Sequence, residues 1–233
     1  MDKYQAVNGD IREINQMADP VAIEVQNFFE QYLKGERNFF KTNLPKANLS
    51  GLHLAKANLN QANLGGANLN GADLSSTMLS QANLRGTALY GSNLREANLR
   101  GVDCQGANLS GADLRGADLR EANLTAARLY GADLSGANIS DANLSGAKLS
   151  GAVLRSASLK RAILIEAEIS CAILRDVNLV QADLSRADLT YTVLHSGDLS
   201  QAILTDTDLS RADLDWLVLE ETNLSSELVL DWT

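Results

Sequence analysis

Aromatic residues are scarce in this sequence: they make up 5% of the 233 residues, so the core of bulky rings usual in globular proteins is excluded. Cysteine occurs twice, which is too few for a disulfide framework. The chain also has no apolar run of transmembrane length, and its first residues have no apolar stretch of the signal-peptide type. We therefore expect a cytoplasmic protein whose core is built from small and medium-sized residues.

Positive charge is also limited, because 20 lysines and arginines stand against 29 acids and give a net charge of −9. Such a balance disfavours nonspecific attraction to nucleic-acid phosphates and to anionic membranes. We expect neither direct nucleic-acid contact nor membrane binding. The acidity is concentrated at one end, since residues 198–233 hold nine acids and one arginine.

Leucine is abundant and recurs at a fixed interval. From Leu44 to Leu224 a repeat centre falls on every fifth residue, and Phe39 extends the series backwards to 38 centres without an insertion. The residue two before the centre is alanine in 25 of the 38 repeats, and asparagine or aspartate is commonest just before the centre. The other exceptions to leucine at the centre are Cys104, Ile139 and Ile169.

A period of five fits neither common secondary structure. On a helix the leucines would spread around the whole surface, and on a flat strand they would alternate between faces. The chain must therefore bend at each repeat, so that the centre and the residue two before it always point inward. Thirteen of the 17 glycines lie two residues after a centre, where tight corners are expected. Short strands joined by corners predict a β-solenoid.

The repeats resemble the pentapeptide-repeat family: residues 107–111 read ANLSG and residues 112–116 read ADLRG. The resemblance covers residues 37–226. It implies an all-β fold, a right-handed quadrilateral β-helix with four repeats per coil. The chain would then form about nine and a half coils, a shaft about 45 Å long at the usual strand spacing.

Both ends of such a shaft expose backbone edges that need a cap. Asp19 followed by Pro20 predicts a helix start, and Gly35 predicts its end, so we expect a capping helix over residues 19–35. Residues 1–18 are predicted to be a flexible segment. The apolar side chains of the expected helix are Ile23, Phe28, Phe29, Tyr32 and Leu33.

An apolar cluster at the other end supports a C-terminal cap over residues 227–233. Its side chains either close the last coil or pair with a second chain, so both a monomer and a C-terminal homodimer remain open. The resemblance supports the dimer, because gyrase-inhibiting members of the family join through this end. The candidate cap or dimer contacts are Trp216, Leu217, Leu228, Leu230 and Trp232.

Residues twenty apart should lie above one another, which places a basic row and an apolar ladder on one face. One interpretation is a contact surface for an acidic protein partner. The alternatives are solvated arginines offset by Asp113, Asp118, Glu121 and Asp176, and β-branched residues that merely suit strand geometry. The candidate protein-contact residues are Arg95, Arg115, Arg155, Arg175, Val153, Ile173, Val193 and His195.

The residues of an active site are not gathered anywhere in the repeat pattern. His53 and His195 share a face but should lie about seven coils apart, roughly 34 Å at the strand spacing. Cys104 takes a core position, where a thiol is buried and inert, and Cys171 falls at an exposed corner. We therefore expect no enzyme activity, no cofactor and no metal site.

Three functions remain. The sequence favours a non-enzymatic interaction scaffold or regulator that binds an unidentified protein partner along the face with both ladders. The first alternative, implied by the resemblance, is a DNA-mimic inhibitor of DNA gyrase or another topoisomerase; the near-neutral shaft argues against it and the acidic C-terminal end supports it. The second is a structural spacer between the two ends.

Overall fold

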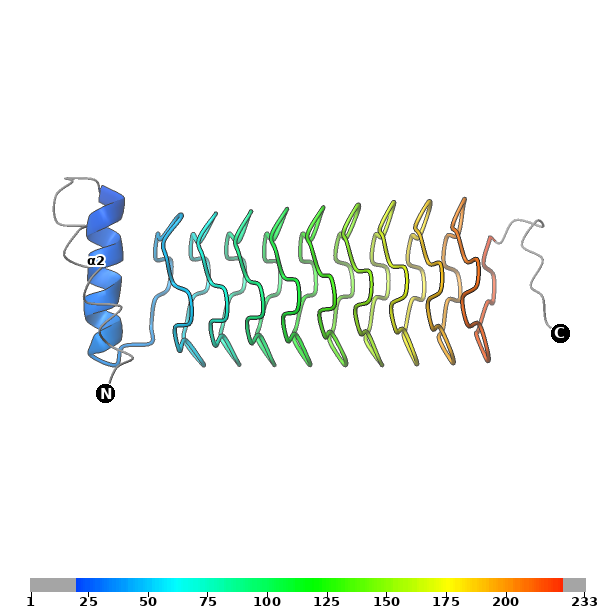
Figure 1. Cartoon of the computed structure of the whole chain (residues 1–233), viewed down its shortest axis with the longest axis horizontal. Helices are drawn as coiled ribbons and strands as arrows, with labels where there is room; N and C mark the ends of the chain where they lie inside the picture. The colour runs from blue at the N-terminus through cyan, green and yellow to red at the C-terminus, as the bar shows by residue number, and fades with distance from the viewer. Residues whose placement is uncertain (1–19, 224–233) are drawn as a thin grey trace.

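The structure is a shaft of stacked coils with one helix across its N-terminal end (Figure 1). It is a computed structural model that describes residues 20–223. Its strands are single-residue parallel bridges that pair each residue before a centre with the residue twenty later, from Asn38↔Asn58 to Asp198↔Val218. Four repeats therefore make one coil, and the right-handed β-helix is confirmed. The number of coils stays a prediction, because the count includes residues beyond 223.

Hydrogen bonds between successive coils hold the shaft together. In the repeat centred on Leu134, the centre N–H donates to the carbonyl of Val153 at 2.7 Å, and the Gly136 N–H donates to the carbonyl of Arg155 at 2.9 Å. The Ala137 N–H closes the corner by donating to the Leu134 carbonyl at 2.9 Å. The same pattern recurs along the shaft and satisfies the backbone of a strand that is only one bridge long.

The core is a column of leucines with alanines between them. From Leu44 to Leu209 the leucine centres are at most 6% exposed. Burying one leucine side chain contributes about 1.5–3 kcal/mol. Where a hydroxyl replaces alanine it finds an acceptor, as when Thr77 donates to the Leu54 carbonyl at 3.1 Å. Among the described residues no buried side-chain nitrogen or oxygen lacks a hydrogen-bond partner.

The corners do not require glycine, although the sequence places 13 of its 17 glycines there. Every residue two after a centre, from Lys41 to Glu221, has a φ between 53° and 69°, and only 13 of these residues are glycine. After Gly151 every described corner carries a side chain. A left-handed conformation costs a non-glycine residue roughly 1–2 kcal/mol. Cross-coil hydrogen bonds offset this cost, as in the Cys171 N–H bond to the Thr190 carbonyl at 2.9 Å.

The N-terminal cap is α2, which spans Pro20–Leu33. Phe28 and Phe29 are buried, and the Phe28 ring lies 4.5 Å from the ring of Phe39, the first repeat centre. The Tyr32 hydroxyl accepts a hydrogen bond from the His53 N–H at 3.3 Å. The helix thus covers the open end of the first coil, as predicted.

The details of the helix differ from the expectation in two ways. Ile23 is 56% exposed and Leu33 is 46% exposed, so neither belongs to the apolar stripe that contacts the coil; that stripe consists of Val25, Phe28, Phe29 and Tyr32. The helix ends at Leu33, and Gly35 follows with a φ of 88°. Residues 1–18 and Asp19 lie outside the described residues. No helix within residues 20–223 has the length and apolar character needed to cross a bilayer.

Candidate protein-contact face

The arginine face is the side of the shaft that carries residues 53–55 and the equivalent triplets every twenty residues up to 213–215. In each triplet the middle leucine points inward and the two flanking side chains point outward. The first residue usually accepts a hydrogen bond from the backbone N–H of the third. Ser75 N–H donates to the Asp73 carboxylate at 3.1 Å, and Arg115 N–H donates to Asp113 at 3.2 Å. This turn explains why asparagine and aspartate dominate the position before the centre.

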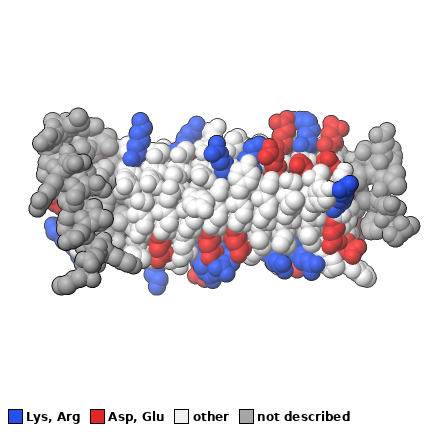
Figure 2. Space-filling view, in the orientation of Figure 1, with Lys and Arg blue, Asp and Glu red and all other residues white. Residues whose placement is uncertain are grey.

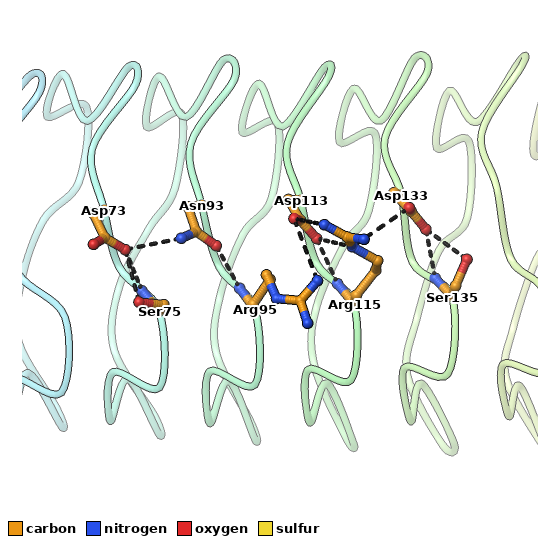
Figure 3. A network of polar contacts seen from close by, with 8 residues as sticks. All are labelled: Asp73, Ser75, Asn93, Arg95, Asp113, Arg115, Asp133 and Ser135. Atoms are coloured by element: carbon orange, nitrogen blue, oxygen red, sulfur yellow. Dashed lines mark hydrogen bonds and ion pairs between the residues drawn. The ribbon is translucent and has the colours of Figure 1, made fainter.

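The N-terminal half of the arginine face neutralises its own charges (Figure 3). Arg115 donates two hydrogen bonds to the carboxylate of Asp113, the shorter of them 2.5 Å, and lies 3.6 Å from Asp133. Arg95 lies 3.9 Å from Asp113. These two arginines of the predicted basic row are therefore balanced by acids on the same face, as the solvated-charge interpretation predicts.

The contacts with Arg95 and Arg115 make the contribution of Asp113 to stability depend on pH. Hydrogen bonding to the Arg115 side chain lowers the pKa of Asp113 below its usual value of about 3.9. Because the folded-state pKa is the lower one, the carboxylate stabilises the fold above about pH 4 and loses this contribution as the pH falls through the folded-state pKa.

We expect Asp113→Asn to lower the free energy of unfolding at pH 7 by about 0.2–1 kcal/mol, the range of exposed ion pairs. Asparagine retains the acceptor for the turn, as Asn93 does for Arg95 N–H at 3.2 Å. Urea titrations of both proteins at neutral and acid pH measure the effect. The difference should shrink toward about pH 3, and a difference that grows in acid would contradict the assignment.

The next face around the coil carries a second row of basic residues, Arg100, Arg120 and Lys160, and most of these are also paired. Arg100 lies 2.7 Å from Glu121, and Arg120 lies 2.5 Å from Asp118. Lys160 has no ion pair among the described residues. In a space-filling view, positive side chains share the surface of the shaft with negative ones, which gather along its lower rim and toward its C-terminal end (Figure 2).

The C-terminal half of the arginine face is different in character. Val153 pairs with Ile173, and Ile173 pairs with Val193, so the three half-buried side chains stack in successive coils. Arg155 and Arg175 flank this ladder, are exposed, and form no ion pair with any described residue. We call these five residues the contact patch. It combines an apolar strip with two uncompensated positive charges.

The apolar ladder costs the fold a recurring hydrogen bond. A valine or isoleucine before the centre cannot accept the N–H of the residue two later, and no described acceptor exists for the N–H groups of Arg155, Arg175 and His195. Each such bond contributes about 0.5–1.5 kcal/mol in a typical protein.

The C-terminal end of the shaft is only partly closed by the described residues. Leu217 packs against the core, and its Cδ1 lies where a side chain on Gly197, one coil below, would stand. Gly197 and Leu217 both stand where most repeats have alanine, and the space left by the glycine is filled by the leucine of the next coil. Trp216 points outward and is 80% exposed, so it does not close the last coil. The other predicted cap or dimer contacts, Leu228, Leu230 and Trp232, lie outside the described residues.

The cysteines and histidines occupy the positions that the repeat pattern assigns to them. Cys104 is buried, which raises the pKa of its thiol to about 12, and Cys171 is exposed. His53 lies 4.0 Å from Asp73 near the N-terminal end of the arginine face. His195 lies at the other end, beside Asp213 and Asp215, a grouping that the sequence analysis missed. The twenty-residue spacing of His195 and Asp215 is the signal that could have revealed it.

The comparison with known families agrees with this geometry. The Pentapeptide repeats family matches in eight copies, which together extend over residues 38–225. The chain belongs to the pentapeptide repeats family. Its coils, twenty residues apart in register, are thus the family's fold, and the contact patch is a feature of this member's surface. No curated protein matches the sequence.

Solved structures of other pentapeptide repeat proteins are similar to this one. HetL of Nostoc sp. strain PCC 7120, a pentapeptide repeat protein involved in heterocyst differentiation regulation, is 31% identical over 84% of this chain and 92% of its own, with a TM-score of 0.55. QnrB1, a plasmid-mediated fluoroquinolone resistance protein, is 25% identical over 75% of this chain and 90% of its own, with a TM-score of 0.41.

Proposed function

We propose that this pentapeptide repeat protein is a non-enzymatic interaction scaffold or regulator whose contact patch binds an acidic segment of a protein partner. The patch presents Val153, Ile173 and Val193 as an apolar strip that runs across three successive coils, with Arg155 and Arg175 beside it. Apolar side chains next to arginine are typical of protein interfaces. An extended acidic segment lying along the shaft would bury the strip and pair with both guanidinium groups.

The observation that carries this proposal is the contrast within one face. Arg95 and Arg115 are held by Asp113 and Asp133, whereas the triplets of Arg155 and Arg175 contain no acid at all. A free guanidinium can form a bidentate bond to a carboxylate of a partner without first breaking a bond of its own. Arg155 and Arg175 are therefore better suited to binding than the two arginines that resemble them in sequence.

The similarity to HetL supports the regulatory part of the proposal, since that protein is involved in the regulation of heterocyst differentiation. The similarity concerns most of both chains and the same repeat fold. It suggests that a shaft of this kind can serve a regulatory process without catalytic groups. Fold similarity by itself does not identify the partner.

The apolar half of the patch is tested with two isoleucines in equivalent repeat positions. Ile173 lies in the patch, and Ile163 lies on the opposite side of the coil, where Asn143 and Asp183 are its neighbours along the shaft. In affinity purification with mass spectrometry, a partner retained by the wild-type protein should be lost from Ile173→Asp and kept by Ile163→Asp. Equal recovery with both variants, or loss with both, would remove the patch from consideration.

The charged half has its own matched pair of variants. Arg155→Gln/Arg175→Gln should weaken binding of the same partner by about 2 kcal/mol or more, about thirty-fold, because two charge-assisted contacts are lost. Arg95→Gln/Arg115→Gln should change the affinity little, because those arginines are already paired. Titration of the purified partner measures both, and a larger loss in the second variant contradicts the proposed site.

The DNA-mimic alternative requires a continuous row of negative charge. The arginine face carries positive side chains over several coils, and its acids are paired in the N-terminal half. The acidic residues 198–233 keep this alternative as a prediction. Inhibition of gyrase supercoiling by the purified protein would support it, and its absence at micromolar concentration would count against it.

A further inference from the structure

Three metal-binding side chains meet at the C-terminal end of the arginine face. His195, Asp213 and Asp215 each offer one donor atom, and these atoms all lie within 4.8 Å of one another. His195 and Asp215 hold the same position in successive coils, and Asp213 is two residues before Asp215 on the same side of the strand. The coil register, fixed by the Ser196 N–H bond to the Asp215 carbonyl at 2.9 Å, brings the three together.

The two carboxylates have no cationic partner on the described part of the chain. Elsewhere on this face aspartates receive side-chain donors: Asp73 accepts from Asn93 at 3.0 Å, and Asp133 accepts from the Ser135 hydroxyl at 2.6 Å. The Asp213 carboxylate accepts only the backbone N–H of Asp215, and no side chain among residues 20–223 donates to the Asp215 carboxylate. Two like charges thus stand side by side, which is unfavourable unless a cation joins them.

The grouping stands apart from the other acidic residues in its geometry. Although the chain has 29 aspartates and glutamates, this is the one set of three histidine, cysteine or acidic side chains among the described residues whose donor atoms lie so close. An imidazole nitrogen with two carboxylates also differs from an all-oxygen set. Such mixed donors favour zinc and neighbouring divalent transition metals over magnesium and calcium.

We propose that His195, Asp213 and Asp215 bind one divalent transition metal ion, with water completing its coordination. The ion would link two successive coils near the open end of the shaft, where fewer cross-coil bonds remain. To bind an ion at about 2.0–2.2 Å the three side chains would rotate toward one another; His195 and Asp213 are half-buried and Asp215 is exposed. This proposal does not rest on the function of the contact patch, because it uses none of the five patch residues.

Isothermal titration of the full chain with zinc chloride tests the site. We expect one saturable site in the wild-type protein. His195→Ala and Asp213→Asn should each weaken zinc affinity by more than about tenfold, since even outer-shell partners of a bound metal contribute that much. His53→Ala is the matched control, because His53 lies on the same face beside Asp73 and should leave the affinity unchanged.

Circular dichroism of each variant verifies that the coils remain folded, and Asp215→Asn supplies an independent second carboxylate variant. Magnesium chloride in place of zinc should give no saturable binding of comparable affinity. The proposal is wrong if His195→Ala binds zinc as tightly as the wild-type protein, because zinc would then bind dispersed carboxylates. Absence of a saturable zinc site in the wild-type protein overturns it as well.

Discussion

Replacement of Leu174 by alanine is expected to lower the free energy of unfolding by about 2–5 kcal/mol. Leu174 is a repeat centre that is 1% exposed, and it stacks between Leu154 and Leu194 of the adjacent coils. Truncation removes apolar contacts on both sides along the shaft. The backbone resists collapse into the cavity, because hydrogen bonds of 2.7 Å each, from Leu174 N–H to the Val193 carbonyl and from Leu154 N–H to the Ile173 carbonyl, hold successive coils at a fixed spacing.

The adjacent residue is the control for this experiment. Ile173→Ala removes a side chain of the same size from the outward side of the same strand, so its cost should stay below about 1 kcal/mol. Denaturant titration followed by circular dichroism compares the two. Because repeat shafts can unfold in parts, the transition of each variant should be recorded with a second probe as well. Equal costs for both variants would mean that the inward and outward positions are wrongly assigned.

Enlarging an alanine position should also destabilise the shaft. Ala132 is fully buried between Ala112 and Ala152 of the neighbouring coils. Ala132→Leu is expected to cost about 1–3 kcal/mol, because the extra carbon atoms have no space between coils that hydrogen bonds hold together. The same column accepts a leucine at Leu52, but that residue lies in the first coil, beside the N-terminal cap. Ala132 has a coil on each side, so the effect should be strong there.

The contrasting variant is Ala88→Leu, which lies just before a centre and points outward. We expect it to change the free energy of unfolding by less than about 0.5 kcal/mol, the usual range for surface substitutions. Thermal unfolding of both variants against the wild-type protein measures the difference. A tolerated leucine at position 132 would show that the central coils can widen, contrary to the packing described above.

The five-residue period of leucine predicted the solenoid because each repeat must bury the same two positions. The repeat alone does not state how many repeats close one coil, so the twenty-residue register came from the family resemblance. That register decides which outward side chains meet. It places Val153, Ile173 and Val193 in one ladder, and the bridges between them confirm this geometry.

Local bonds within a triplet were harder to predict. The sequence aligned Arg95, Arg115, Arg155 and Arg175 as one basic row, yet only the first two pair with acids. Asp113 lies in the same triplet as Arg115 and one coil after Arg95, and Asp133 lies one coil after Arg115. The corners were misleading for a related reason. Glycine predicts a left-handed residue well, but cross-coil hydrogen bonds impose the same conformation on side-chain-bearing residues.

The most direct test of the contact patch is site-specific photo-crosslinking in the intact protein. A photoreactive phenylalanine analogue would replace Ile173 in one sample and Ile163, on the opposite side of the coil, in the other. The patch predicts a crosslink to one partner from position 173, lost when Arg155 and Arg175 are changed to glutamine. A crosslink to that partner from position 163 but not from position 173 would contradict the proposal.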